Sequence, residues 1–272
     1  MDNNRNRMDR QTRGRTQVLL LGCNFMNEGK YDRSDSIIVV SLDREKGEVK
    51  LASILRDIYV DLHEYGTEKI NAALICGGPE YTVQIVNENF GLNIRYYALV
   101  DMRGLVNIID LIGGIDIEIT EMERIFLNCW VRDLAMQLKD GIIPPPLEKA
   151  GLVHMDGRTA MSHARNRAIG SDFARSDRQR AVLRAMAGKI KENTGPIQRI
   201  KLFLRCMKYI KTNLSLPRAA ALGVCALKSV NAGIPSIRIP AENTYRVSRD
   251  KEWHFEINFE ENTTILEQFF AS

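Results

Sequence analysis

Several features that would assign a function directly are missing from this sequence of 272 residues. No apolar run approaches the ~18 residues of a transmembrane helix, and no secretory signal segment is visible. The five cysteines are scattered without a CxxC pair, which argues against a zinc site. The formal charge of +4, from 38 Lys and Arg against 34 Asp and Glu, is too small to indicate nucleic-acid binding by itself. No Ser/His/Asp triad spacing is evident.

The apolar fraction of 44% is enough for a sizeable core. Continuous or alternating apolar runs predict strands, and the following ranges carry them: 17–23, 36–42, 49–55, 96–101, 115–120, 236–239 and 253–259. The turn at Lys46-Gly47 predicts that the third of these strands pairs antiparallel with the second. Three of the strands therefore carry Asn24, Asp35 and Arg56 near their ends, where binding groups commonly collect.

Helical periodicity predicts helices between and after the strands, at 69–76, 79–90, 102–112, 122–138, 172–191, 196–211, 216–230 and 264–270. Residues 1–16 are polar, basic and without period, so we predict that they are disordered. No internal repeat or low-complexity linker divides the remainder. We therefore predict one α/β domain over 17–272, with a mixed sheet flanked by helices.

An arginine-rich region at 156–191 is the most unusual stretch of the chain. Arg165 and Arg167 are two residues apart, so an extended backbone would point them the same way, and Gly170 would allow a turn into the following helix. Ser171 or Asp172 is the expected N-cap of that helix. Guanidinium groups suit phosphate oxygens, but a helix face that is simply solvated is an equally good interpretation of this stretch alone.

Eight stretches, in this order and spacing, resemble the LytR-CpsA-Psr family of bacterial cell-wall enzymes. They are LLLGCN (19–24), RSDS (33–36), SILRD (53–57), KINAA (69–73), GGP (77–79), GGIDIEI (113–119), MDGRTAMSHARNR (155–167) and DFARSDRQ (172–179). The resemblance covers roughly residues 17 to 192, and the C-terminal pattern is compatible with it.

The resemblance implies a three-layer α-β-α sandwich with a central mixed sheet, on the outer face of the bacterial cell membrane. It also implies a phosphotransferase whose ligand is a polyprenyl-pyrophosphate-linked glycopolymer, a teichoic acid or a capsular polysaccharide. The enzyme moves the glycopolymer onto a peptidoglycan acceptor and releases polyprenyl phosphate. Members usually begin with a transmembrane helix, so we expect that an anchor has been removed from this sequence; a soluble cytoplasmic relative is the alternative.

The family's functional residues map onto positions in the matched stretches. The resemblance implies that the pyrophosphate is bound by Arg33, Arg56, Arg165, Arg167, Arg175 and Gln179. It implies that the catalytic residues are Arg56, Arg165, Arg167 and Asp35. An ion pair of Arg33 with Asp35 or Asp57 is an equally good interpretation of that arginine. Asp57, beside Arg56, is expected to orient it rather than to accept a proton. We predict that the arginines of both regions converge on one pocket.

The implied cofactor is Mg²⁺, held by Asp35 and by the residue at position 24. This chain departs from the family there, because Asn24 stands where an aspartate is usual. An amide oxygen can coordinate Mg²⁺ but brings no charge, so we expect a weakened metal site. Asn24 as a loop-capping residue is the alternative. His163, where the family usually has an aromatic residue, is expected to pack in the core rather than to act as a base.

Two other functions remain open at this point. The chain could bind polyprenyl phosphates without transferring them, since Asn24 weakens the metal site. It could also be a nucleic-acid-binding regulator, which the arginine-rich helix favours. Acidic residues interleave the basic ones and helix-turn-helix spacing is absent, so we expect no nucleic-acid partner.

Overall fold

The computed structural model describes residues 15–27, 29–166, 170, 172–193, 195–229, 233–250 and 252–272. The contacts of the chain divide it into two compact units, which are described separately. Unit 1 comprises Met1–Val100 and Lys211–Ser272, and unit 2 comprises Asp101–Ile210. Of the predicted disordered segment, residues 1–14 lie outside the described part, whereas Arg15 already belongs to the first strand. The prediction of one domain over 17–272 stays a prediction.

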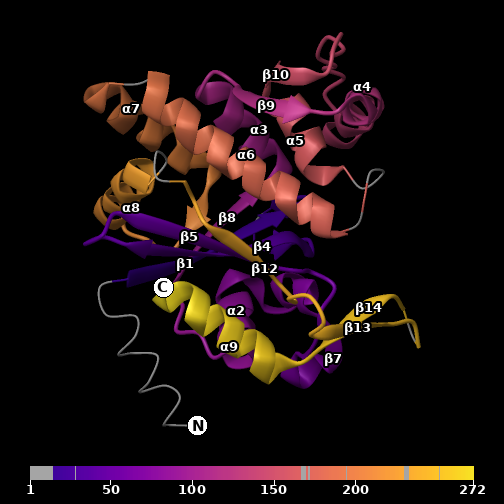
Figure 1. Cartoon of the computed structure of the whole chain (residues 1–272). Helices are drawn as coiled ribbons and strands as arrows, with labels where there is room; N and C mark the ends of the chain where they lie inside the picture. Colours follow the sequence, from indigo (N-terminus) through magenta and orange to yellow (C-terminus); the bar gives the residue numbers. More distant parts are fainter. Residues whose placement is uncertain are drawn as a thin grey trace. The chain divides into compact units, whose positions relative to one another are not determined.

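Unit 1 is built on a six-stranded mixed sheet (Figure 1). Its strands, in spatial order, are β11 (Lys211–Thr212), β8 (Tyr96–Asp101), β1 (Arg15–Cys23), β4 (Ser34–Asp43), β5 (Glu48–Ile54) and β12 (Ser236–Ile239). β4 pairs antiparallel with β1 and β5, and β12 pairs parallel with β5. The predicted strands and the predicted antiparallel hairpin are confirmed. The sheet is mixed because β4 runs antiparallel to both of its neighbours, whereas β12 runs parallel to β5.

Helices cover both faces of this sheet, which explains why β4 and β5 are buried along most of their length. α8 (Leu216–Ser229) lies on one face, and its Cys225 donates to the Asp43 carbonyl. α2 (Ala73–Phe90) and α9 (Phe259–Ala271) lie on the other, where the Lys50 ammonium donates to the Phe269 carbonyl over 2.9 Å. The expected α-β-α sandwich with a central mixed sheet is therefore confirmed.

Short hairpins extend from the sheet of unit 1: β2 (Met26–Asn27) with β3 (Lys30–Tyr31), β6 (Tyr59–Asp61) with β7 (Thr67–Lys69), and β13 (Tyr245–Ser248) with β14 (His254–Ile257). Short 3-10 turns lie at η1 (His63–Tyr65) and η2 (Ile70–Ala72). The predicted helix at 69–76 is wrong at its start, because Lys69 ends a strand. The predicted break at the glycine pair is confirmed: Gly78 has φ 77° and ψ −170°, which interrupts α2.

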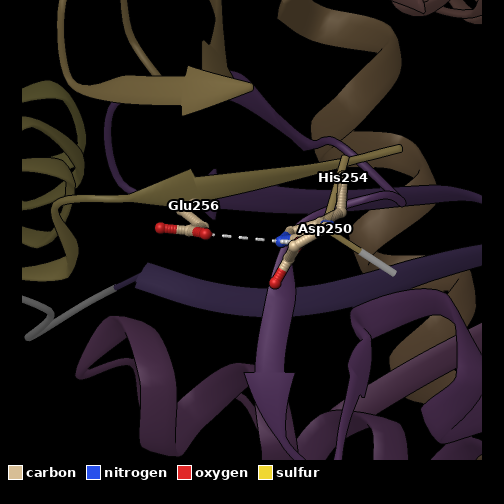
Figure 2. Close-up of side chains that lie close together, drawn as sticks. All are labelled: Asp250, His254 and Glu256. Atoms are coloured by element: carbon tan, nitrogen blue, oxygen red, sulfur yellow. Dashed lines mark ion pairs between the residues drawn. The ribbon is translucent and has the colours of Figure 1, made fainter. Parts of the chain in front are cut away.

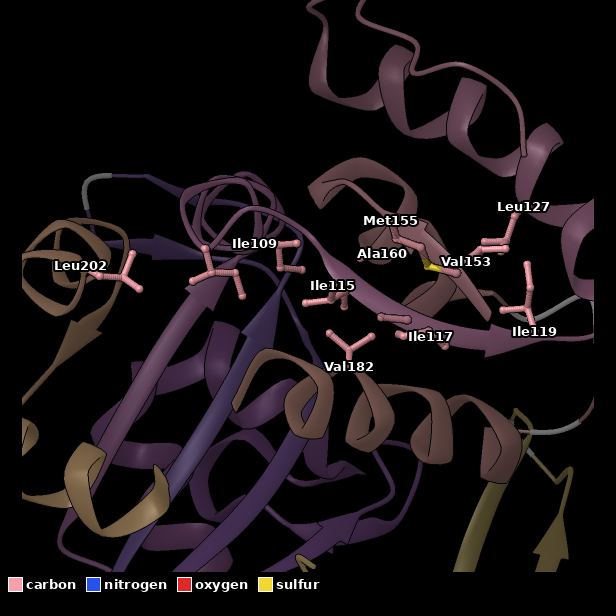
Figure 3. Close-up of a cluster of buried hydrophobic side chains, with 12 residues drawn as sticks. Ile109, Ile115, Ile117, Ile119, Leu127, Val153, Met155, Ala160, Val182 and Leu202 are labelled. Atoms are coloured by element: carbon pink, nitrogen blue, oxygen red, sulfur yellow. The ribbon is translucent and has the colours of Figure 1, made fainter. Parts of the chain in front are cut away.

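Unit 2 contains a two-stranded sheet and several helices. Its elements are α3 (Met102–Leu111), β9 (Ile115–Ile119), α4 (Glu121–Leu138), β10 (Gly151–Met155), α5 (Gly157–Arg165), α6 (Asp172–Asn193), α7 (Pro196–Cys206) and η3 (Met207–Tyr209). β9 alternates strictly, so Ile115, Ile117 and Ile119 enter the core while Asp116 and Glu118 face solvent. Figure 3 shows these isoleucines packed with side chains from β10 and the helices.

α5 and α3 approach each other closely, and the sequence specifies that contact. A Cβ at Gly157 would lie 2.2 Å from the Val106 carbonyl oxygen, so no larger residue fits there. The Gly157 amide donates to Asp110 over 2.7 Å. Asp156 caps the helix by accepting from the Thr159 amide over 2.8 Å. The MDGRTAM stretch therefore begins a helix that the periodicity analysis did not predict.

The five cysteines are all free thiols. Cys23 and Cys225 are buried, as expected for small core residues, but Cys129 is exposed. Among the described residues, no helix combines the length and the apolar character that crossing a membrane requires.

Candidate functional site

Arg56 of unit 1 is held between two carboxylates immediately after β5. Its Nη1 pairs with Asp35 Oδ1, and its Nε donates to Asp57 Oδ2 over 3.0 Å. The Arg56 side chain is only 15% exposed, and Asp57 is buried. The expectation that Asp57 orients Arg56 is confirmed. A guanidinium fixed in this way is preorganised for an anion, because little side-chain freedom remains to be lost on binding.

Lys69 and Glu252 extend this charged cluster. Lys69 Nζ lies 3.4 Å from Asp57 Oδ1 and 2.9 Å from Glu252 Oε2. Sequence reasoning gave neither residue a role. Lys69 belongs to KINAA, one of the stretches that resemble the family, and this position could have marked it as a candidate site residue. Glu252 had none, because it is brought to Lys69 from 183 residues away along the chain.

Arg33 makes contacts other than the expected ones. Its guanidinium donates to Glu68 over 3.1 Å and to Asn71 Oδ1 over 3.3 Å. An ion pair with Asp35 or Asp57 is therefore wrong as the explanation of Arg33, since its guanidinium is bound by Glu68 and Asn71 instead. The hydrogen bond that Arg33 donates to the Glu68 carboxylate raises the pKa of Arg33.

The two residues expected to hold Mg²⁺ adjoin the last pair between β1 and β4. Cys23 pairs with Ser34, so Asn24 and Asp35 each come next to that pair. Within the described part of the chain, the buried Oδ1 of Asn24 has no hydrogen-bond partner. An unsatisfied buried amide oxygen is costly, and Mg²⁺ accepts oxygen ligands of this kind. The donor set of one carboxylate and one amide oxygen therefore fits the ion.

Arg165 is the last residue of α5 in unit 2. Its Nη1 donates to Gln137 Oε1 over 2.7 Å, and Gln137 donates in turn to Asp133 over 2.6 Å. Arg165 is helical rather than extended, because the capped helix from Gly157 continues through it. Arg167 lies outside the described residues. Gln137 is a positioning candidate that sequence reasoning missed, since it comes from the helix α4.

Three arginines of α6, Arg175, Arg178 and Arg180, are buried, so a solvated helix face does not describe them. Arg175 is 4% exposed and pairs with Asp172 over 2.9 Å. Arg178 donates to the Asn166 carbonyl over 2.6 Å. Asp172 is the first residue of α6, and the alternative N-cap, Ser171, lies outside the described residues. Gln179, one turn after Arg175, is half-buried.

His163 is enclosed in unit 2 and is 2% exposed. Burial, with a smaller contribution from Arg178, lowers the pKa of His163 to about 4 against an opposing effect of Glu123. The imidazole is thus neutral at physiological pH. These observations favour the packing role expected from the sequence.

We expect His163 to make the free energy of unfolding depend on pH. Its pKa is about 4 when folded and about 6.5 when unfolded, so the unfolded chain binds more protons between these values. Stability should therefore fall by about 2 kcal/mol from pH 7 to pH 5. Urea unfolding at both pH values would measure this.

His163→Phe should remove this part of the pH dependence, since it keeps an aromatic side chain without a titrating group. An identical pH dependence in the parent and His163→Phe proteins would contradict the assignment.

Comparison with known proteins places the chain in a family. The family model described as LytR_cpsA_psr matches residues 1–269. The chain therefore belongs to the LytR-CpsA-Psr family, as the eight stretches of sequence indicated.

Individual relatives are more distant. Regulatory protein MsrR of Staphylococcus aureus is 27% identical over 235 residues, covering 85% of this chain and 66% of MsrR. The polyisoprenyl-teichoic acid–peptidoglycan teichoic acid transferase TagV of Bacillus subtilis is 27% identical over 255 residues, covering 88% of this chain and 60% of TagV. The chain thus spans less than two thirds of the length of these curated relatives.

Solved structures support the fold. The crystal structure of B. subtilis TagV superimposes with a TM-score of 0.74 at 26% identity, covering 94% of this chain and 97% of that one. A structure of TagT bound to LIIa-WTA gives a TM-score of 0.72 at 22% identity, covering 96% of this chain and 91% of that one.

Proposed function

We propose that this chain is a phosphotransferase that attaches polyprenyl-pyrophosphate-linked glycopolymers, of the teichoic acid or capsular polysaccharide type, to peptidoglycan. Membership of the family and the transferase name of TagV support this. The observation that carries it is Arg56, an arginine held rigidly by Asp35 and Asp57 at the end of a strand. The reaction takes place, on this proposal, at the extracytoplasmic face of the membrane.

The proposed reaction requires positive charge around the pyrophosphate. An acceptor hydroxyl of peptidoglycan forms a bond to the phosphorus that carries the glycan, the bridging P–O bond breaks, and the hydroxyl proton is released. Polyprenyl phosphate leaves with additional negative charge. Positioning and charge stabilisation dominate the catalysis of such transfers. We propose that Arg56 binds pyrophosphate oxygens, and that Arg165, Arg167 and Arg175 also have pyrophosphate-binding roles.

The remaining residues have supporting roles in this proposal. Gln179 would donate a neutral hydrogen bond to a phosphate oxygen, and Arg33 would add charge at the edge of the ligand. Asp35 and Asn24 would hold Mg²⁺. When bound, the ion would neutralise charge on the pyrophosphate oxygens. Asp57 and Gln137 position arginines rather than touch the ligand.

One experiment tests the transfer directly. The chain is incubated with a polyprenyl-pyrophosphate-linked glycan and peptidoglycan fragments, and mass spectrometry follows polyprenyl phosphate and the phosphodiester product. Both should form in Mg²⁺, and less should form in chelator. Ligand that stays bound without release of polyprenyl phosphate would instead establish a binding protein, the alternative that Asn24 favours.

Arg165 offers a test of how the pyrophosphate is recognised. Arg165→Lys should weaken pyrophosphate binding by about tenfold, nearly as much as Arg165→Ala, because lysine lacks the planar fork. Lysine also cannot keep both a ligand contact and the bond to Gln137. Calorimetry with polyprenyl pyrophosphate would measure the affinities.

Arg158→Lys is the matched control, since this arginine of the same helix pairs with Asp140 instead. It should bind like the parent. Equal affinity of Arg165→Lys and the parent would show that charge alone matters at this position.

A further inference from the structure

A histidine and two carboxylates meet on the β13–β14 hairpin of unit 1 (Figure 2). His254 Nε2 lies 3.7 Å from Asp250 Oδ1 and 3.6 Å from Glu256 Oε1. One potential ligand atom from each side chain lies within 4.8 Å of the others. His254 is 1% exposed, whereas Asp250 is at the surface. The cluster is thus anchored in the interior and open on one side.

The histidine is held in the orientation that a ligand needs. Its Nδ1 lies 2.7 Å from the Glu252 carbonyl oxygen. A carbonyl can only accept, so Nδ1 carries the hydrogen and the lone pair of the neutral ring is on Nε2. Tyr59 stacks on the ring with centroids 3.6 Å apart and planes 9° apart. Metal-binding histidines characteristically donate their second ring N–H in this way.

The distances from His254 Nε2 to the two carboxylate oxygens also fit an intervening metal ion better than they fit direct hydrogen bonds. Both exceed the 2.7–3.2 Å of an ordinary N–H···O bond. A tetrahedral Zn²⁺ with bonds near 2.0–2.1 Å spaces its ligand atoms about 3.4 Å apart. Arg246 pairs with the other oxygen of Glu256, Oε2, and the Ser248 hydroxyl donates over 2.8 Å to Asp250 Oδ1, the oxygen that faces His254. Both carboxylates are therefore oriented by neighbours.

We propose that Asp250, His254 and Glu256 bind a divalent transition-metal ion, with Zn²⁺ as the representative. The imidazole nitrogen favours Zn²⁺ over Mg²⁺ or Ca²⁺, which prefer all-oxygen ligands. Three protein ligands leave a coordination position for water. This site goes beyond the proposed transferase and its Mg²⁺, and its existence does not depend on that activity.

The position of the site gives the ion a structural consequence. The amide of Phe255, beside His254, donates to the Asp57 carbonyl over 2.9 Å. Glu252, whose carbonyl binds the His254 ring, also pairs with Lys69 through its carboxylate. An ion that fixes the hairpin therefore stiffens the backbone and the charged cluster around Asp57, which orients Arg56.

The test is a Zn²⁺ titration of the full chain in competition with a chromophoric chelator, supported by the visible absorption of Co²⁺. The parent should bind one Zn²⁺ at this site, and His254→Gln should bind it at least about tenfold more weakly. His63→Asn is the matched control: His63 also pairs with a carboxylate, Glu88, but the described residues give it no third ligand, and its φ of 54° suits asparagine. It should bind Zn²⁺ like the parent.

Because His254 is buried, replacing it can also destabilise the fold. A second variant therefore separates loss of Zn²⁺ binding from loss of folding. Asp250→Asn removes an exposed ligand and should weaken Zn²⁺ binding while the melting temperature in chelator stays that of the parent. Asp35→Asn, at the proposed Mg²⁺ site, should leave this Zn²⁺ affinity unchanged. Equal Zn²⁺ affinities of the parent, His254→Gln and Asp250→Asn would overturn the proposal and leave the cluster as contacts within the hairpin.

Discussion

Arg56→Ala is expected to lower kcat/KM for transfer by two to three orders of magnitude, the usual effect of removing one preorganised charge-stabilising donor. Arg56 contacts Asp35 and Asp57 at once, so its guanidinium cannot be replaced by a mobile cation. Arg56→Lys should therefore recover only a small part of the loss. The rate of polyprenyl phosphate release measures the effect.

Loss of folding must be separated from loss of catalysis in this experiment, because Arg56→Ala also leaves the buried Asp57 with Lys69 as its remaining cationic partner among the described residues. Arg15→Ala provides the comparison. Arg15 is likewise buried and paired with an aspartate, Asp43, over 3.3 Å in the same sheet. It should reduce the melting temperature without lowering kcat/KM beyond the loss of folded protein. Parent-like transfer by Arg56→Lys would contradict the role given to Arg56.

Asp57 should behave as a positioning residue. Asp57→Asn keeps a hydrogen-bond acceptor for Arg56 but removes the charge, so we expect a smaller loss in kcat than Arg56→Ala causes. The contribution of Asp57 to the fold through Lys69 should appear separately as a lower melting temperature.

The central sheet could be predicted from the sequence because its strands are buried on both faces and give continuous apolar runs. β1, β4 and β5 illustrate this, and the turn at Lys46-Gly47 specified the pairing of the last two. The helix α5 was missed for a local reason. Its sequence, GRTAMSHAR, is short and rich in polar residues, and its first residue is a glycine required by contact with Val106.

A site residue could be predicted only where the sequence around it showed a strand end or matched a family motif. Arg56 and Asp35 stood near strand ends in matched stretches, and their ion pair agrees with that assignment. Partners from distant elements could not be found in this way. Glu252 and Gln137 reach Lys69 and Arg165 through tertiary contacts, and nothing in their neighbouring sequence distinguishes them from surface residues.

Asn24→Asp is expected to strengthen Mg²⁺ binding to the ligand-free protein by about ten- to a hundredfold, or about 1.4–2.8 kcal/mol. The buried Oδ1 of Asn24 has no hydrogen-bond partner in the described part of the chain, so a carboxylate would place charge where an oxygen ligand is already available. In the parent, Asp35 supplies the only charge of the proposed pair, and it also balances Arg56. Mg²⁺ should therefore bind the parent well only when pyrophosphate adds anionic oxygens.

The same change should have the opposite effect on the ligand when the ion is absent. A second carboxylate repels the pyrophosphate. In chelator, the Asn24→Asp protein should therefore bind polyprenyl pyrophosphate more weakly than the parent does, whereas its rate of transfer in Mg²⁺ should be higher. Calorimetric titrations of Mg²⁺, with and without polyprenyl pyrophosphate, measure both effects. Asn243→Asp adds the same charge at an exposed position and should change neither. If Asn24→Asp and the parent bind Mg²⁺ alike without ligand, Asn24 is not a metal ligand, and its unpartnered oxygen must be explained by the loop it belongs to.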